Sequence, residues 1–208
     1  MSLLIGGESE NQNNILAYIK QSKVNKKVGV LAFDEKDNIG VSAVELTKDH
    51  SFQLVPFKHK ERSTLFVAGE SGAGKSYFVR EYAKEYRKMY PNNPIYLISY
   101  LEHDETLDSY KEIIRLDAFS QDFLDECLDI KLDEEFPDCF VIFDDIDSIV
   151  EKKIKVKIYG LLNKMLRIGR HYGISVAYVG HELYNSPELN QILNESMTIT
   201  FFPKYLNY

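Results

Sequence analysis

The stretch TLFVAGESGAGKSYFVREYAKEY, residues 64–86, decides the fold of this chain. An apolar run of strand character breaks into glycines, and a pattern with helical spacing then follows. The spacing of Gly69, Gly74, Lys75 and Ser76 satisfies G-x-x-x-x-G-K-[ST], the signature of a phosphate-binding loop. That signature needs a strand before it and a helix after it, and this stretch predicts both. We therefore expect the loop to bind a nucleotide.

The whole chain has the composition of a globular protein. Its 208 residues are 44% hydrophobic, which is enough to bury a sizeable core. The formal net charge of -7 argues against a polycationic nucleic-acid coat, so any contact with DNA has to be local. Only Cys127 and Cys139 occur, and the start lacks a secretory signal, so we expect an intracellular, reducing setting. No apolar run approaches the roughly 20 residues that cross a bilayer, so we expect no membrane insertion.

The pattern predicts two parts of unequal size. Residues 1–60 read as a small N-terminal α+β or β-hairpin appendage, in which NILAYIKQ at 14–21 has the pattern of a short helix. Two β-like runs flank the turn-rich DEKDN at 34–38. Over residues 61–208, strand-like runs alternate with helical patterns. This alternation predicts an α/β fold, a P-loop NTPase core with a mainly parallel central sheet flanked by helices.

The predicted loop has the chemistry that a nucleoside triphosphate needs. Its glycines let backbone N–H groups and the N-terminus of the next helix point at phosphate. We expect Lys75 to reach the β- and γ-phosphates of ATP, and Ser76 to offer its hydroxyl to Mg²⁺. The expected nucleotide-binding residues are Gly69, Glu70, Ser71, Gly72, Ala73, Gly74, Lys75 and Ser76.

A second motif, CFVIFDDID at residues 139–147, is typical of a Walker B strand. Four consecutive apolar residues run into Asp144 and Asp145. We expect Asp144 to hold the Mg²⁺ shell and Asp145 to orient or deprotonate the attacking water. Asp147 has no such role in this interpretation, and we expect it to cap a helix that begins at Ser148.

His181 follows GISVAYVG, a buried-type strand that we expect beside the Walker B strand. A polar side chain at that point can sense the γ-phosphate or the attacking water. The alternative is a surface histidine that only makes hydrogen bonds.

The long helix between these strands combines an apolar face with an opposite basic stripe. The stripe consists of Lys153, Lys157, Lys164, Arg167 and His171. Its lysines are typical of a solvated surface. Arg167 and Arg170 are alternative candidates for a guanidinium that reaches the γ-phosphate of a neighbouring subunit. We favour Arg170, which lies at the edge of the stripe beside a glycine turn.

Taken together, the motifs resemble the FtsK/HerA-like genome-packaging ATPases of large DNA viruses, including the poxvirus-type packaging enzyme. The resemblance spans most of residues 63–204 and rests, in order, on GESGAGKS, YLISYLEHDETLD, FVIFDDIDSI, LLNKMLRIGRHYGISVAYVGHE and ILNESMTITFFPK. It implies Mg²⁺-dependent hydrolysis of ATP in a homo-oligomeric ring that drives double-stranded DNA into a capsid. Viral capsid components would be partners, in the host cytoplasm, a viral factory or the virion. It also implies further helical sequence after Tyr208 in a full-length relative.

Two other functions share the phosphate-binding loop. One is a P-loop small-molecule kinase, although no separate Arg-rich lid segment is evident and adjacent Asp144 and Asp145 suit water activation better. The other is a nucleotide-switched assembly or binding protein. Stimulation of hydrolysis by DNA separates the motor from both.

Overall fold

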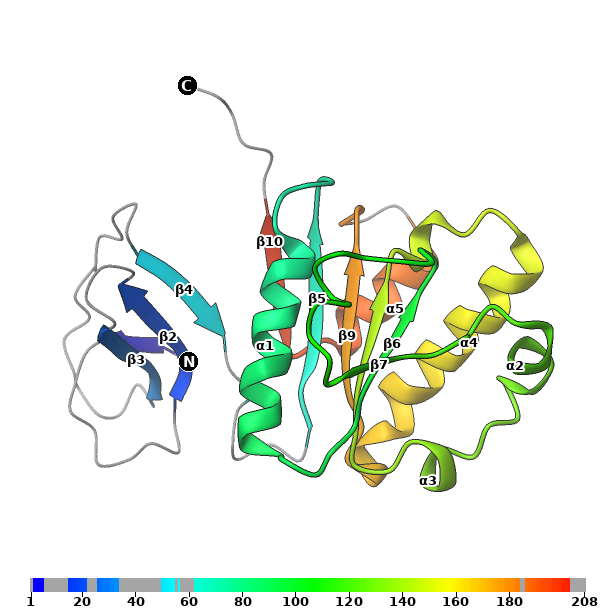
Figure 1. Cartoon of the computed structure of the whole chain (residues 1–208), viewed down its shortest axis with the longest axis horizontal. Coiled ribbons are helices and arrows are strands. Elements are labelled where there is room, and N and C mark those ends of the chain that lie inside the picture. The colour runs from blue at the N-terminus through cyan, green and yellow to red at the C-terminus, as the bar shows by residue number, and fades with distance from the viewer. Residues whose placement is uncertain are drawn as a thin grey trace.

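The computed structural model contains two sheets, one antiparallel and one parallel (Figure 1). It describes the backbone of residues 2–5, 15–21, 26–33, 50–54, 56, 62–183 and 186–202. Side chains are described for residues 56, 62–183 and 186–202.

The larger sheet is parallel throughout, with the strand order β10-β5-β9-β8-β6-β7. Its strands are β5 (Thr64–Gly69), β6 (Ile95–Ser99), β7 (Ile113–Arg115), β8 (Phe140–Asp144), β9 (Ser175–Gly180) and β10 (Thr198–Phe202). The three central strands β5, β9 and β8 are buried at every residue, because helices cover both faces of the sheet. The predicted α/β fold with a mainly parallel sheet is confirmed.

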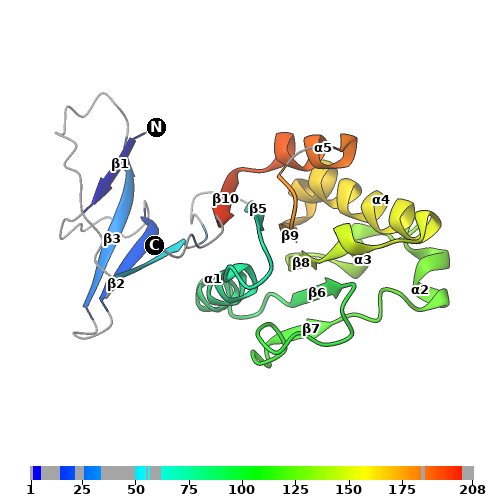
Figure 2. The ribbon, with the colours of Figure 1, turned by 90° about the horizontal axis from the view of Figure 1, so that it is seen from above.

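Helices pack on the two faces of this sheet (Figure 2). They are α1 (Lys75–Met89), α2 (Gln121–Glu126), α3 (Leu132–Glu135), α4 (Lys152–Ile168) and α5 (Pro187–Glu195), with short 3₁₀ turns η3 (Ile146–Ser148) and η4 (Gly169–Tyr172). Successive side chains of β5 alternate between two cores: Leu65 and Val67 pack with α1, whereas Phe66 and Ala68 pack with α4 and α5. Within the described parts of the chain, no helix is both long enough and apolar enough to span a membrane.

The smaller sheet is antiparallel and has the order β1-β3-β2-β4. Its strands are β1 (Ser2–Ile5), β2 (Ile15–Gln21), β3 (Lys26–Phe33) and β4 (His50–Leu54). The predicted helix at 14–21 is wrong, because this segment is strand β2 and pairs with a strand on each side. Seven residues are too few for a helix to hold on propensity alone, and two ladders of cross-strand bonds override it.

The remaining N-terminal predictions have mixed outcomes. The first β-like run coincides with β3, whereas the second, near residues 39–46, lies outside the described residues. The division into an appendage at 1–60 and a core at 61–208 stays a prediction.

Candidate active site

Three segments that are distant in the sequence meet at the carboxyl edge of the parallel sheet. The loop after β5, the acidic residues that end β8, and His181 after β9 share this edge because the three strands are parallel and adjacent in the order β5-β9-β8. This is the edge at which open α/β sheets place their ligands. β9 does lie beside β8, which brings the end of its strand next to the acidic pair.

The loop between β5 and α1 is shaped by glycines with two different functions. Gly72 and Gly74 have φ angles of 75° and 97°, in the left-handed region that favours glycine. A Cβ atom at either residue would meet nothing within 4 Å, so the outer side of the loop is open. Gly69 is different, because a Cβ atom there would collide with the backbone oxygen of Phe202 in β10. Two glycines therefore shape the open loop, and the third lets β10 pack against it.

The N-terminus of α1 faces this open space. Gly74 is the N-cap residue and provides no side chain, and the first helical bond runs from Phe78 N to Gly74 O at 2.9 Å. The N–H groups of Lys75, Ser76 and Tyr77 precede that bond, so they have no acceptor within the helix. An anion above the loop would accept from these groups and would meet the positive end of the helix dipole.

Lys75 holds its ammonium group against the loop instead of extending it into solvent. The residue is only 6% exposed. Its Nζ donates to the backbone oxygens of Gly69 at 2.8 Å and Glu70 at 2.9 Å. The nearest partners of this buried ammonium, two carbonyl oxygens and a ring nitrogen of His181 at 3.4 Å, are not anions, which suits it to bind a phosphate.

Asp144 is a buried carboxyl group at the end of β8. It is 1% exposed and accepts a hydrogen bond from Ser99 Oγ at 3.2 Å. Burial, and then the charges of Asp145 and Asp104, raise the pKa of Asp144 to about 7, although the Ser99 bond and the charge of Lys75 act in the opposite direction. A divalent cation would relieve this cost, because it supplies the positive charge that the site lacks.

Asp145 and His181 form a hydrogen-bonded pair that reaches Lys75. Asp145 has a φ of 53°, and its N–H donates to Val179 O at 3.1 Å, which turns its side chain toward the end of β9. Its Oδ1 lies 2.9 Å from His181 Nε2, and His181 Nδ1 lies 3.4 Å from Lys75 Nζ. If Lys75 donates to Nδ1, the ring proton sits on Nε2 and is donated to Asp145. His181 is thus the link between the loop lysine and the acidic pair.

The prediction that Asp147 caps a helix is wrong. Ser148 ends the 3₁₀ turn η3, and α4 begins only at Lys152. Asp147 Oδ2 instead accepts a hydrogen bond from the backbone N–H of His181 at 2.7 Å. One ligand atom from each of Asp145, Asp147 and His181 lies within 4.8 Å of the others, so this corner is dense in groups that bind cations. Asp147 holds the chain of His181 in place.

Ser99 and Asp147 are the two site residues that sequence reasoning did not identify. Ser99 is buried, donates to Asp144, and accepts from Leu101 N at 3.2 Å. The available signal was weak: Ser99 is the polar residue that ends the apolar run of β6. Its importance follows from β6 pairing with β8, which aligns Ser99 with Asp144.

The two candidate arginines are not brought to this edge. α4 starts from the carboxyl edge after β8 and ends before β9 begins, so Arg167 and Arg170 lie at the amino edge, away from the chain's own loop. With the amide of Gln191 oriented to satisfy its neighbours, its oxygen accepts from Arg167 Nε at 2.9 Å and Nη2 at 3.2 Å. Arg170 is exposed, and its guanidinium makes no hydrogen bond or ion pair with another described residue.

The lysines of the predicted basic stripe are partly engaged in structural contacts. Lys157 forms an ion pair with Asp125 at 3.1 Å. Lys164 Nζ donates to the backbone oxygens of Leu128 at 3.1 Å and Ile130 at 2.6 Å. These contacts fasten the segment around α2 to α4, so the stripe is not a free cationic surface.

Comparison with known proteins gives one clear relative in sequence. No family model matches the chain. A curated protein of the Sputnik virophage, uncharacterized protein V3, is 36% identical over 156 residues, which make up 73% of this chain and 61% of V3. The chain thus spans about three fifths of the length of the curated relative that it matches.

Solved structures show the same fold at low sequence identity. The cytoplasmic domain of EssC aligns with a TM-score of 0.57 at 17% identity, over 94% of this chain and 37% of that chain. ATPases 2 and 3 of EssC from Geobacillus thermodenitrificans align with a TM-score of 0.50 at 13% identity, over 95% and 38% of the two chains. The genome packaging NTPase B204 from Sulfolobus turreted icosahedral virus 2 aligns at 0.47 and 15% identity, over 71% and 78%, a likeness too loose to bear on function.

Proposed function

We propose that this chain binds ATP with Mg²⁺ and hydrolyses it. One observation carries the proposal: an ammonium, a buried carboxyl group and a carboxylate–imidazole pair converge on an open glycine loop at one edge of the sheet. Lys75, Asp144, Asp145 and His181 supply these groups. Each type of group has a defined task in phosphoryl transfer to water.

The residues fit a nucleotide with its metal ion. The outer side of Gly72 and Gly74 is open, and the helix N-terminus faces the same space, so this loop would hold the phosphates. Ser76, in the first turn of α1, and Asp144 offer hard oxygen ligands for Mg²⁺. The ion, when bound, neutralises charge on the phosphates.

The side chains then divide the work. When the nucleotide binds, the ammonium of Lys75 would give up its bonds to the carbonyl oxygens of Gly69 and Glu70 and bond to the β- and γ-phosphates. These phosphates would lie in the same loop, so the ammonium has only a short distance to move. Asp145 accepts a proton from the attacking water or orients it. His181 fixes Asp145 through a 2.9 Å bond and lies 3.4 Å from Lys75, so it can respond to the γ-phosphate at both ends of its ring.

At a finer level we propose that hydrolysis drives double-stranded DNA into a viral capsid, with the chain acting in a homo-oligomeric ring. The ordered motif series of the sequence supports this proposal, and so does the virophage origin of the relative V3. Double-stranded DNA, further copies of the chain and viral capsid components are then the partners. The protein would then act in an infected cell or in the virion.

The deciding measurement is the ATPase rate with and without double-stranded DNA. For a translocase we expect DNA to raise the rate, and the rise to shrink as salt increases, because phosphate contacts release counterions. Asp145→Asn is the internal control: it should keep ATP bound but slow hydrolysis by about 10²-fold or more. Normal turnover by that variant would show that another residue is the base. If DNA does not change the ATPase rate at any salt concentration, the chain is not a DNA translocase.

One observation keeps a small-molecule kinase as the second candidate. A cavity of about 680 Å³ lies beside Ser99 at the same edge, lined among others by Tyr100, Arg115 and Phe119. A small hydroxyl substrate there would sit near the nucleotide. If incubation with ATP and a hydroxyl compound yields the phosphorylated compound in place of free phosphate, the chain is a kinase.

A further inference from the structure

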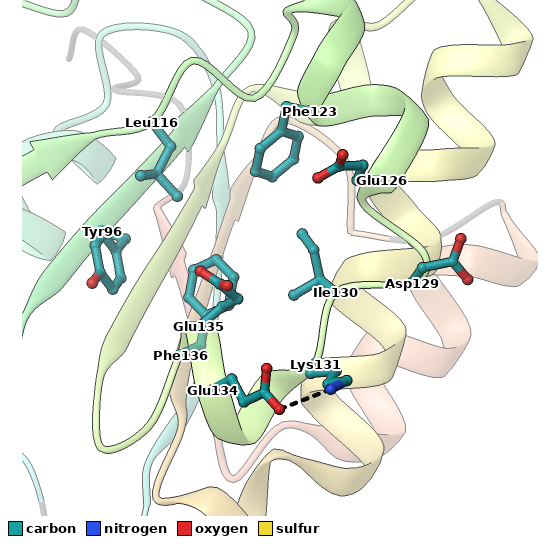
Figure 3. Close-up of a pocket in the computed structure, with 10 residues that line it drawn as sticks. All are labelled: Tyr96, Leu116, Phe123, Glu126, Asp129, Ile130, Lys131, Glu134, Glu135 and Phe136. Carbon is teal, nitrogen blue, oxygen red and sulfur yellow. Dashed lines mark hydrogen bonds and ion pairs between the residues drawn. The ribbon is translucent and has the colours of Figure 1, made fainter.

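A groove with an apolar floor and an acidic rim lies between strand β6 and the segment that carries α2 and α3 (Figure 3). Its volume is about 490 Å³. Figure 3 shows Leu116, Phe123 and Ile130 around the same open space, with Tyr96 and Phe136 completing the floor. A hollow of this size and lining takes two or three apolar side chains of a ligand.

The rim of the groove carries uncompensated negative charge. Of its carboxylates, only Glu134 is paired, with Lys131 at 2.8 Å. The carboxylates of Glu126, Asp129 and Glu135 make no hydrogen bond or ion pair with another described residue. Four carboxylates and one ammonium leave three negative charges around an apolar floor. The complementary ligand is an apolar segment flanked by lysine or arginine.

The chain itself presents such a segment, VEKKIKVK at residues 150–157. Val150 is 88% exposed and Val156 is 59% exposed, although valine side chains are more often buried. Lys152 and Lys153 are exposed beside them, and their ammonium groups have no hydrogen-bond or ion-pair partner among the described residues. Of the four lysines in this segment, Lys157 is paired with Asp125 and Lys155 donates to Asp147 O, so Lys152 and Lys153 carry the positive charge that is free to oppose the rim of the groove.

Within one molecule the segment does not occupy the groove, because both valines stay in solvent. The segment begins beside the acidic residues at the carboxyl edge of the sheet. The groove instead reaches the amino edge, where Asp138 N, two residues after Phe136, donates to Tyr172 O at 2.8 Å. A contact between segment and groove is therefore a contact between two molecules, of the head-to-tail kind that can close a ring.

We propose that a second copy of this chain docks residues 150–157 in the acidic groove of the first. The valines enter the apolar floor, and Lys152 and Lys153 meet the carboxylates of the rim. The opposite charges steer the encounter and fix its direction, so the association weakens as salt increases. No nucleotide takes part in this contact.

The contact also bears on the candidate arginine, and only this consequence rests on the proposed function. Arg170 lies in η4, which adjoins the amino-edge end of the groove through the Asp138–Tyr172 bond. The docked segment starts at the carboxyl edge of the neighbour, where the proposed nucleotide site lies. The groove that receives it is at the amino edge of the first molecule. Docking therefore turns Arg170 of the first molecule toward the neighbour's nucleotide.

Directed cross-linking of nucleotide-free protein tests the docking. Two variants with one added cysteine each, Val150→Cys and Glu135→Cys, are mixed and mildly oxidised. The native Cys127 and Cys139 are fully buried, so they do not interfere. We expect a disulfide-linked heterodimer in clear excess over the mixture of Val150→Cys with Glu188→Cys, a control on α5. Equal yields in the two mixtures overturn the proposal, and so does a dominant Val150→Cys homodimer, which would place two segments face to face.

Charge reversal is the second test, measured by sedimentation velocity across protein concentration. Lys152→Glu with Lys153→Glu should weaken association by about tenfold or more, and so should Glu126→Lys with Glu135→Lys. Mixing these two double variants should restore association, because the opposite charges face each other again. Asp133→Lys, on α3 but outside the groove, is the matched control and should have no effect. Failure of the mixture to recover overturns the proposal even if ATP hydrolysis is normal.

Discussion

At the scale of single residues, the candidate site buries a cation that the phosphates of a nucleotide would balance, and a carboxyl group that a divalent cation would balance. The ammonium of Lys75 is bonded to neutral carbonyl oxygens, and Asp144 has a pKa raised to about 7 by burial. Such sites trade stability for function. Three predictions belong to this scale.

Lys75→Ala should weaken ATP binding by about 10- to 100-fold, because a charge-assisted bond to the phosphates is lost. Titration calorimetry measures the affinity. Lys84→Ala, farther along the same helix and paired with Glu81, is the matched control and should bind ATP normally. Unchanged affinity in the Lys75 variant would mean that its ammonium does not contact the nucleotide.

Asp144→Asn should stabilise the nucleotide-free protein at neutral and higher pH. The folded pKa of about 7 lies above the ordinary value of 3.8, so the wild-type carboxyl group costs stability progressively as pH rises through that interval. The cost approaches about 4 kcal/mol above pH 7 and vanishes near pH 4. The amide carries no charge, so melting temperatures of the two proteins should coincide at low pH and diverge as pH rises. Parallel curves would contradict the raised pKa.

Ser99→Ala should raise the Mg²⁺ concentration that half-saturates hydrolysis, because the carboxylate of Asp144 loses the donor that orients it. Affinity for nucleotide without Mg²⁺ should not change. Ser99→Thr keeps the hydroxyl and should recover the wild-type response. If alanine and threonine variants behave alike, Ser99 acts only through packing.

At the scale of elements, one glycine connects the loop to the edge strand of the sheet. β10 pairs in parallel with β5, and its last residue, Phe202, lies opposite Gly69. Phe202 also packs edge-on against Phe78 of α1, with ring centroids 5.5 Å apart. Strand, loop and helix are therefore joined at one point.

Gly69→Ala should destabilise the protein by about 1–3 kcal/mol, because its Cβ would collide with the backbone of Phe202 in a conformation that side chains rarely adopt. Chemical denaturation measures the loss. Gly72→Ala is the comparison, since its Cβ would meet open space and only backbone strain acts there. Equal losses would show that strain, and not contact with β10, governs both positions.

At the scale of the whole molecule, the proposed nucleotide site and the candidate arginines lie at opposite edges of one sheet. An arginine at the amino edge can act on a nucleotide only if a second molecule presents its carboxyl edge. Head-to-tail assembly meets this condition, and it is also the geometry of the segment and groove contact.

If Arg170 is the guanidinium that acts on the neighbour's nucleotide, Arg170→Ala should bind ATP normally through its own loop but should hydrolyse it slowly. Mixing Arg170→Ala with Lys75→Ala subunits should recover part of the activity, since some interfaces then pair an intact loop with an intact arginine. ATPase rates of the mixture and of each variant alone measure this. Normal hydrolysis by assembled Arg170→Ala would direct attention to Arg167, which contacts Gln191 in the same chain.

The sequence by itself determined the loop, the acidic strand end and the α/β class, because these depend on spacings within a few residues. A glycine pattern or an apolar run that ends in aspartates constrains the backbone locally. The sequence alone also indicated that His181 ends a buried strand. The expectation that this strand lies beside the Walker B strand is confirmed, but the sequence could not specify that β5 lies on its other side or that the imidazole stands 2.9 Å from Asp145.

Tertiary structure decided everything that depends on pairing between distant segments. β2 is a strand because it has a partner on each side, although its seven residues read as a helix. Ser99 meets Asp144, 45 residues away in sequence, only because β6 pairs with β8. The direction of α4 sends both arginines to the far edge. Local propensity contributes little free energy compared with the hydrogen bonds and the burial that are gained across the fold. Contacts between distant segments therefore depend on the order of the strands and not on the local sequence pattern.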